Sequence, residues 1–574
     1  MRWYPLPSGP RSRSAVPGHS RFAIFARVGL LPLALALGTV LGLGSYAETN
    51  DDPTLAWLFA GVLALQPVPA VPLYFHGFGH ALAALYAVRL GVAWLGLLQG
   101  GLLAGATGLF FAVLDRLLRP YLRPWPLALV LVLFFGLAWL EHWLWFSHAR
   151  VTLLLAGGSV LFAAQRPVSR WALLLGLLGL AAAWLLRPGL ALLAFGAVLP
   201  TAGLLAGGWR RAVPVLASAA LGLGLATGAA ALLQTPPAAR YQARDSCFAR
   251  ILDFEQLRAQ PRTPADSLGT AAVSSWLLGD STAVAGALGR QVYRFDAPDF
   301  LLRVAPAKLR LRAGLLARDY FALLLSLAAT AMVVVQLRTR RVGFWAIQLG
   351  YLATLALVAS LLKLPPRLAL PLLDFWLLTN VAFLLKQGGV GDVTDRSAVL
   401  VSLAAPVFIP RLRCLGMVLA GGVVLLYAAK TYHRLQVLSK EQRRHEAALA
   451  EITRCTAGRV RVLAGTNDLL KSLSPFRSYS LGPGPVLLLS GWSAHDPSQP
   501  CLRQRLAGTA DQTACLRRLA QPGSSARWVL SAETARWLNR RFRYPTGAGP
   551  AVVLRPGPVL AADTALRYYL PYPR

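Results

Sequence analysis

The sequence predicts a mainly α-helical, polytopic membrane protein with a small α/β domain at its C-terminal end. Of its 574 residues, 56% are hydrophobic and only 14% are charged, which is too apolar for an ordinary soluble chain. The apolar residues gather into repeated runs that are long enough, or nearly long enough, to cross a bilayer. After residue 430 these runs give way to short apolar segments typical of a soluble domain.

The charge distribution excludes one function class. The chain has 58 Lys and Arg against 24 Asp and Glu, a formal net charge of +34. On a soluble protein this excess would suggest nucleic-acid binding. Here the basic residues stand one to three at a time between apolar runs, as they do in the loops that orient membrane helices. We therefore expect membrane lipid as a partner and no nucleic acid.

The N-terminal part sets the predicted orientation. Residues 1–27 carry arginines and no acid, which predicts a basic N-terminus in the cytoplasm, and the apolar run 28–46 predicts the first span. Residues 47–91 then form a first outer loop. Within it, 53–65 and 75–90 are too short to cross and are predicted to be interfacial helices.

The remaining spans follow from apolar runs separated by basic loops. The chain divides into a membrane domain at 28–430, which includes a large polar outer loop at 234–313, and a soluble domain at 431–574. The stretch 397–410 either crosses or re-enters, so about eleven or twelve spans are expected, and the side of the C-terminal domain stays open. The spans after the first are predicted at 92–114, 126–140, 151–164, 171–186, 189–206, 212–233, 314–337, 342–362, 368–385 and 414–429.

The C-terminal domain begins with an amphipathic basic helix at about 431–454. Its apolar segments predict strands near 459–463, 486–489, 528–531 and 551–554. Two further segments, 469–473 and 532–541, predict helices. No phosphate-binding glycine motif and no catalytic triad is evident there.

The most informative motif is an acidic stretch at the outer end of the first span, which holds Glu48, Asp51 and Asp52 before Pro53. Asp52 fits a helix N-cap, with Pro53 at the first helical position. That role does not account for Asp51 or Glu48. Neighbouring carboxylates repel unless a cation, a metal or a proton to be abstracted uses them. The stretch therefore predicts a general base at the mouth of a membrane cavity.

In this order of elements the chain resembles the GT-C superfamily of polytopic membrane glycosyltransferases, whose first outer loop carries a short acidic motif followed by two interfacial helices. Two further steps are similar to that family: Arg187-Pro188-Gly189 after a mid-chain span, and the stretch from Arg367 to Pro371 entering a late helix. The resemblance covers roughly 28–430.

The resemblance implies an inverting transfer of sugar from a polyprenyl-phosphate donor to an extracytoplasmic acceptor, which is a glycan, a lipid or a protein, in a bacterial inner membrane. Asp51 would be the first choice for the general base and Asp52 the second, while Glu48 would assist or bind the acceptor. No cofactor is required by the resemblance, and a divalent cation such as Mg²⁺ or Mn²⁺ stays open.

Side chains at predicted outer membrane ends are candidates for substrate binding. A lipid phosphate calls for positive charge, and arginine suits bidentate contact with phosphate oxygens. His76 and His80 share a helix face, which favours packing or acceptor contact over metal binding. Glu141, His142 and His148 fall in the second outer loop. The candidates for substrate binding are Arg187, Arg367, Lys363, His76, His80, Glu141 and His142.

Other function classes remain open. A transporter or flippase for lipid-linked or anionic substrates would be expected to show internal repeats and charges near the membrane midplane, and no clear repeat is evident. A membrane O-acyltransferase would use His76 or His142 as its base. A non-catalytic assembly protein is the fourth alternative.

Overall fold

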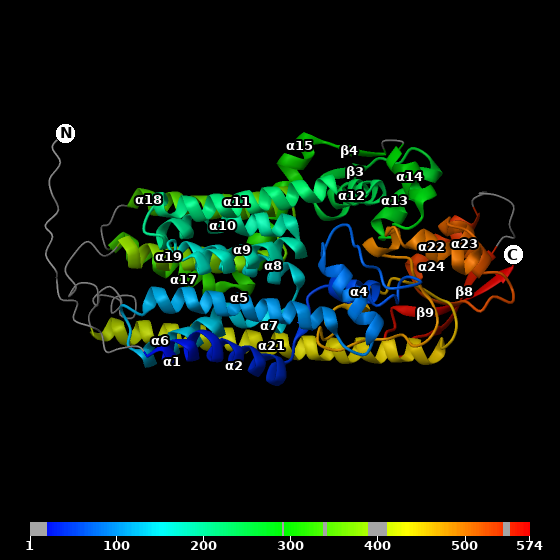
Figure 1. The fold of residues 1–574 in the computed structure, drawn as a ribbon. Coiled ribbons are helices and arrows are strands. Elements are labelled where there is room, and N and C mark those ends of the chain that lie inside the picture. Colours follow the sequence, from blue (N-terminus) through cyan, green and yellow to red (C-terminus); the bar gives the residue numbers. More distant parts are fainter. Residues whose placement is uncertain (1–19, 290–291, 337–340, 388–409, 544–551, 574) are drawn as a thin grey trace, which may run out of the picture.

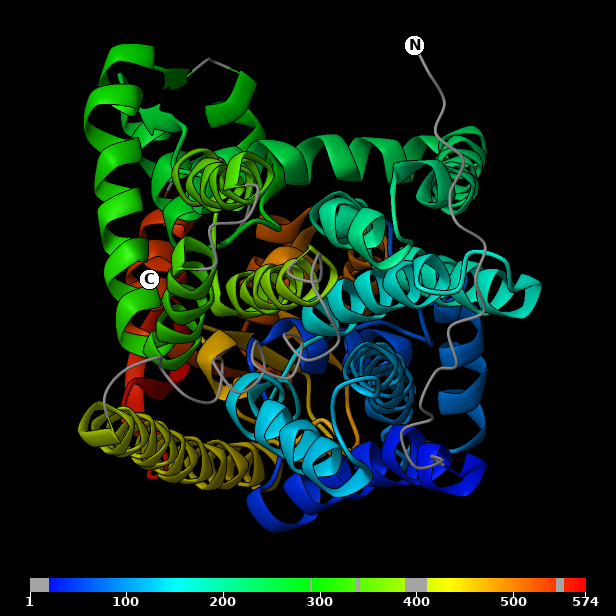
Figure 2. The same ribbon diagram turned by 90° about the vertical axis from the view of Figure 1, so that its left-hand side faces the viewer.

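A bundle of apolar helices carries a mixed α/β domain at one end (Figure 1). The computed structural model describes residues 20–289, 292–336, 341–387, 410–543 and 552–573. Figure 2 looks along the bundle and shows helices from distant parts of the chain lying next to one another. Residues 1–19 and most of the stretch 397–410, for which a basic terminus and an ambiguous span are predicted, lie outside the described residues.

The helices of the bundle largely follow the apolar runs. They are α1 to η2 (Arg21–Leu43), α5 (Trp94–Leu118), α6 to α7 (Pro124–Leu144), α8 (His148–Ala164), α9 (Arg170–Leu186), α10 (Pro188–Leu205), α11 (Trp209–Leu232), α17 (Phe321–Gln336), α18 (Arg341–Leu361), α19 (Pro366–Gln387) and the first part of α21 (Pro410–Cys455).

The predicted fold class is confirmed, with a smaller number of clear spans. In the described part of the chain, seven helices are long and apolar enough to cross a membrane, or eight if the pair Ala297–Asp319 and Phe321–Gln336, bent by 90°, is one span. The sequence predicts eleven or twelve. Two of the additional predictions, α8 and α9, have 17 residues each, fewer than the roughly 20 that a straight span needs.

Helix α8 lies at the centre of the bundle and is buried along nearly its whole length. Small residues allow its neighbours to approach closely, as in many membrane bundles. A Cβ atom on Gly157 would lie 2.4 Å from the Phe375 ring of α19. One on Gly176 of α9 would lie 2.8 Å from Ala163. The small side chains therefore set the spacing of α8, α9 and α19.

The first loop contains two short helices, α3 (Asp51–Phe59) and α4 (Phe78–Val88), neither long enough to cross. Just before them, β1 (Tyr46–Ala47) pairs in parallel with β2 (Trp145–Phe146). The residue that caps α3 is Asn50, so the predicted N-cap role of Asp52 is wrong. The Asp52 carboxylate instead accepts hydrogen bonds from Gln99 and His148.

The C-terminal domain contains a five-stranded mixed sheet in the order β6-β5-β7-β9-β8. The first three strands in this order are parallel, and β9 is antiparallel to both of its neighbours. The strand β9 has no counterpart among the predicted strands. The elements are β5 (Arg461–Ala464), β6 (Val486–Leu488), α22 (Gln499–Ala507), α23 (Gln512–Leu519), β7 (Arg527–Ser531), α24 (Ala532–Arg543), β8 (Val552–Val559) and β9 (Leu566–Pro573).

The large polar loop packs against this domain. Its helices are α12 (Pro236–Phe248), α13 (Pro264–Ser274) and α14 (Ser281–Gly289), and α13 lies against α24 (Figure 1). Phe248 and Leu268 of the loop join Trp528 of the domain in one hydrophobic cluster. Inside the contact, Arg541 Nε donates to Asp280 Oδ2 at 2.7 Å. The large polar loop and the C-terminal domain therefore pack together as one structural unit.

The C-terminal domain contacts the first loop through backbone hydrogen bonds, and it packs closely against a glycine of α5. Ala47 N donates to Leu473 O at 2.8 Å, and Ser472 N donates to Ala47 O at 2.9 Å. The chain then runs over α5, where a Cβ atom on Gly96 would lie 1.8 Å from Pro475 O. The C-terminal domain and the first loop thus lie at the same end of the bundle, a relation that the sequence leaves open.

The first prediction concerns the close packing of Gly96 against Pro475. Gly96→Ala should lower the thermal unfolding midpoint of the detergent-purified protein, because forced overpacking costs about 1 to 3 kcal/mol. Protease cleavage near Pro475 should increase. Gly101→Ala is the control on the same helix, since its Cβ atom would meet nothing within 4 Å. Equal midpoints for the two variants would contradict the packing described here.

The second prediction concerns the buried ion pair. Burial raises the pKa of Asp280, but the hydrogen bond and charge of Arg541 outweigh it and hold that pKa below its ordinary value of 3.8. The pair therefore stabilises the fold above that value, and the stabilisation is lost as pH falls through the lowered folded-state pKa. At pH 7, Arg541→Leu should cost about 3 to 5 kcal/mol, because it leaves a buried charge unpaired.

Thermal unfolding from pH 7 down to pH 4 checks this. The unpaired Asp280 carboxyl of the variant takes up a proton at a higher pH than the paired carboxyl of the wild type. The difference in unfolding free energy between wild type and variant should therefore decrease as the pH is lowered. Arg536→Leu, an exposed change on the same helix, is the control. A deficit that stays constant with pH would refute the role given to Asp280.

Candidate functional site

The three carboxylates of the acidic stretch differ in exposure. The Asp51 side chain keeps 16% of its surface exposed, whereas Asp52 keeps 5% and Glu48 keeps 3%. All three lie where the first loop meets the end of the bundle. Of these carboxylates, Asp51 is therefore the one that an incoming molecule reaches most readily.

Asp52 belongs to a buried chain of hydrogen bonds. Gln99 Nε2 donates to Asp52 Oδ1 at 2.8 Å, and His148 Nδ1 lies 3.0 Å from the same oxygen. The other ring nitrogen of His148 lies 3.2 Å from Arg187 Nη1. Because a guanidinium can only donate, His148 Nε2 accepts and His148 Nδ1–H donates to Asp52. Asp52 thus orients Arg187 through His148.

Glu48 joins two bundle helices to the first loop. Arg150 Nε of α8 donates to Glu48 Oε2 at 2.7 Å. The backbone N of Arg367, at the start of α19, donates to Glu48 Oε1 at 3.0 Å. A carboxylate at a helix N-terminus is favourably placed for the free N–H groups and for the helix dipole. Glu48 therefore fixes the position from which the Arg367 side chain extends.

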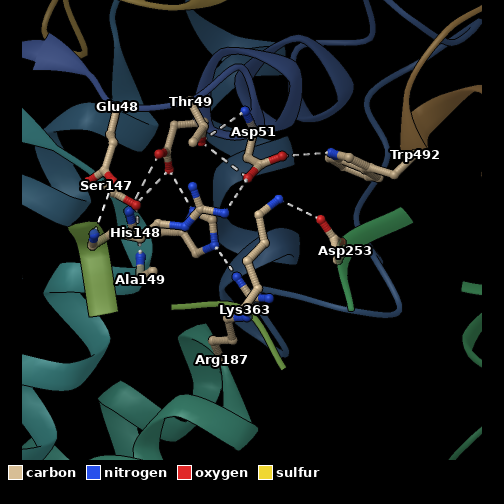
Figure 3. Close-up of polar contacts among 12 residues, drawn as sticks. Glu48, Thr49, Asp51, Ser147, His148, Ala149, Arg187, Asp253, Lys363 and Trp492 are labelled. Atoms are coloured by element: carbon tan, nitrogen blue, oxygen red, sulfur yellow. Dashed lines mark hydrogen bonds and ion pairs between the residues drawn. The ribbon is translucent and has the colours of Figure 1, made fainter. Parts of the chain in front are cut away.

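Asp51 lies among donors and cations (Figure 3). Trp492 Nε1 donates to Asp51 Oδ1 at 3.1 Å, and Thr49 Oγ1 donates to Oδ2 at 3.1 Å. Arg367 Nη2 lies 4.0 Å from Oδ2. Burial raises the pKa of Asp51, but the charges of Arg367 and Arg187 and the hydrogen bond from Thr49 outweigh it, and the pKa lies below its usual range. Asp51 is therefore ionised at neutral pH.

Two arginines beside Asp51 have side-chain N–H groups without a partner among the described residues. Within the described residues no carboxylate lies at ion-pair distance from Arg187, whose guanidinium carbon lies 4.8 Å from the centroid of the Tyr74 ring. The Arg367 guanidinium has Asp51 at 4.0 Å as its ion-pair partner. Lys363 is different, since its Nζ lies 2.6 Å from Asp253 Oδ1 (Figure 3). The two arginines provide an anion-binding environment next to an ionised carboxylate.

A fourth carboxylate, Asp245 of α12, completes the surroundings. Burial and the neighbouring Asp253 raise its pKa to about 6, and the charge of Asp51 adds to this rise while Arg187 opposes it. The Asp245 carboxyl makes no hydrogen bond to any residue that the structure describes. The site thus contains two carboxyl groups whose pKa values are shifted in opposite directions, a pattern typical of functional sites.

Two of the other candidates, Glu141 and His142, lie in a separate buried cluster. Glu141 is paired with Lys430 and Arg434 of α21. His142 Nε2 lies 2.8 Å from Asp374 Oδ2, and both side chains are fully enclosed. Arg150 Nη1, at 3.4 Å from His142 Nδ1, connects this cluster to Glu48. The geometry gives Glu141 and His142 roles in holding helices together.

The imidazole rings of His76 and His80 make no hydrogen bond to the described residues. His76 is half-buried, with its ring centroid 5.7 Å from that of Trp184, and burial lowers its pKa. His80 is exposed on α4. No group of three or more His, Cys, Asp or Glu side chains in the described ranges has an arrangement suited to a metal ion. The option of a divalent cation stays a prediction.

Two cavities of the bundle differ in their distance from the acidic stretch. A cavity of about 50 Å³ lies beside Asp52, between α3, α5 and residues 474–479. A larger one, of about 710 Å³, lies between α10, α18 and α19 near Trp209 and Lys386. This larger cavity is at the opposite end of α19 from Arg367, so its position does not connect it to the acidic stretch.

The fold and the site define an integral multi-pass membrane protein in which an acidic loop is enclosed by the bundle and by a second, mixed domain. No protein-family model, no curated protein and no solved structure matches the chain. The resemblance to GT-C enzymes therefore stays a prediction.

Sequence reasoning alone does not find several residues of the site. Trp492 and Asp245 stand far from the acidic stretch in sequence and carry no local motif. Arg150 stands just before the predicted span 151–164, at a membrane end where a basic residue is common and carries no specific signal. The sequence places His148 only in the second outer loop, and the structure places it against Asp52.

The third prediction separates the two adjacent aspartates. Asp52→Asn should destabilise the protein by about 1 to 3 kcal/mol, because an amide replaces a buried acceptor of two hydrogen bonds. Asp51→Asn should change the thermal unfolding midpoint much less, since its side chain is partly exposed. Calorimetry of both purified variants checks this. The reverse order of midpoints would contradict the structural role of Asp52.

Proposed function

We propose that this protein is a membrane glycosyltransferase that takes a sugar from a polyprenyl-phosphate donor, with Asp51 as general base. One observation carries the proposal: an ionised, partly exposed carboxylate lies at the end of a membrane bundle, beside two arginines that have N–H groups without a partner in the described part of the chain. A lipid-linked phosphate has this combination of an apolar tail and a negative headgroup. The resemblance in the order of the first-loop elements supports the same function.

The chemistry assigns a role to each side of the site. The Asp51 carboxylate accepts the proton of an acceptor hydroxyl while that oxygen bonds to the anomeric carbon. The bond from the anomeric carbon to the phosphate oxygen breaks, and the lipid phosphate leaves with the electron pair. Arg187 and Arg367 stabilise the negative charge that develops on that oxygen. Attack opposite the leaving group inverts the anomeric centre.

The buried residues act on these groups indirectly. His148, held by Asp52, fixes the Arg187 guanidinium, and Glu48 fixes the start of α19 and hence Arg367. In this proposal Asp52 and Glu48 are positioning residues, not a second base and an acceptor ligand. Lys363 adds positive charge at the rim while paired with Asp253.

The proposed location follows from the charge distribution of the loops. Basic residues occur at the end of the bundle opposite the acidic stretch, where Arg27 and Arg119 pair with Asp115 of α5. By the positive-inside rule this end would face the cytoplasm. The acidic stretch and the C-terminal domain would then lie outside, in the arrangement expected for a bacterial inner membrane.

A second candidate is a transporter, and one observation favours it. His142 and Asp374 form a fully enclosed pair inside the bundle, and intramembrane pairs of this kind occur in proton pathways. A transporter would show uptake by proteoliposomes that depends on Asp374. An O-acyltransferase that uses His142 as its base is less favoured, because this ring is occupied by Asp374 and Arg150.

The fourth prediction tests the glycosyltransferase. Purified protein supplied with polyprenyl-phosphate sugars and a mixed glycan acceptor should transfer sugar, and Asp51→Asn should lower kcat by about 100-fold or more. Arg187→Gln should raise KM for the donor, because it removes a charged contact to phosphate. Measurements with and without chelator would report any dependence on a cation.

Asp468→Asn, an exposed change in the C-terminal domain, serves as the control and should retain full activity. Asp245→Asn asks whether the carboxyl with the raised pKa accepts the proton instead. Unchanged transfer by Asp51→Asn would overturn the assignment of the base, and no transfer by the wild type with any donor would overturn the proposed function.

A further inference from the structure

Trp492 of the C-terminal domain lies at the point where three separate parts of the chain meet. It begins a short 3-10 helix, η7 (Trp492–His495), that follows β6. Its indole is 7% exposed, and its Nε1 atom is 3.1 Å from Asp51 Oδ1 (Figure 3). A residue far away in sequence thus directly contacts the acidic stretch.

The indole is held from several sides. Gly491 adopts a φ of +92°, a conformation that L side chains rarely take, and this turn directs the chain into η7. Gly491 N donates to Trp276 O of the large loop at 2.8 Å. The Trp492 ring packs edge-on against Tyr74 of the first loop, at 5.7 Å between centroids. The donor therefore has a fixed direction.

The contact has a chemical consequence for Asp51. An indole N–H can only donate and has no titration in the physiological range, so it binds the carboxylate form at every pH of interest. A hydrogen bond to the charged form favours ionisation. It also engages Oδ1, while Thr49 and Arg367 lie on the side of Oδ2. The carboxylate is thereby held in one orientation.

We infer that Trp492 is a positioning residue that orients Asp51. Through this residue the C-terminal domain contributes to the reaction centre. This inference rests on the proposed function for the role of Asp51 as a base. The hydrogen bond itself is a property that can be measured apart from that function.

A second tryptophan, Trp57, lies in the same contact between the first loop and the C-terminal domain and provides a matched control. Trp57 Nε1 of α3 donates to Tyr479 O of the C-terminal domain at 3.0 Å. This bond also joins the first loop to the C-terminal domain, but it does not involve a carboxylate. Trp57→Phe and Trp492→Phe each remove one indole donor from the contact and keep an aromatic ring. A difference between them therefore reports on Asp51 and not on docking.

The fifth prediction uses carbodiimide labelling, which modifies protonated carboxyl groups, followed by peptide mass spectrometry. In the folded, monodisperse protein, the pH at half-labelling of Asp51 should rise by about one unit in Trp492→Phe, since one unit corresponds to about a tenfold change in protonation. In Trp57→Phe it should stay at the wild-type value. Coinciding wild-type and Trp492→Phe curves would overturn the inference.

The transfer assay gives an independent second readout. In Trp492→Phe, kcat should fall by about tenfold with little change in KM for the donor, and the acid limb of the pH profile should move upward with the labelling curve. If wild-type protein transfers no sugar, the proposed function fails while the labelling still decides the contact. If transfer occurs and Trp492→Phe behaves as Trp57→Phe does in both assays, the inference fails alone.

Discussion

The backbone around Ala47 is held between two other segments, and the arrangement of the site depends on this constraint. On one side β1 pairs with β2, and on the other Ala47 exchanges hydrogen bonds with Leu473 and Ser472. The acidic residues follow directly along the chain. Because the backbone is fixed immediately before them, each carboxylate has a defined neighbour, and a shift at Ala47 would displace all three together.

Burial and charge then give the carboxylates different roles. A charge taken out of water must be paired and hydrogen-bonded to be tolerated. Glu48 has Arg150 and the backbone of Arg367, and Asp52 has His148 and Gln99. Asp51 keeps some exposure, with its arginine partner at 4.0 Å. The two enclosed carboxylates form the scaffold, and the third is left for contact with a ligand.

The same rule explains the charges within the bundle. His142 meets Asp374, and Glu141 meets Lys430 and Arg434, so both of these buried acidic side chains have a partner on another helix. Lipid offers no hydrogen bonds, which makes such pairs strong constraints on which helices lie together. They tie α7 to α19 and to α21, the helix that leads into the C-terminal domain.

The membrane class, the first-loop helices and most strands of the C-terminal domain can be predicted from the amino-acid sequence, because apolar periodicity and turn residues are local signals. The sequence also indicates Glu48, Asp51 and Asp52 as candidate site residues, since clustered carboxylates on an apolar chain require partners. The partner of each carboxylate becomes apparent only in the folded chain. Trp492, His148, Arg150 and Arg367 come from distant segments, and backbone docking and helix packing, which leave no local pattern, bring them together.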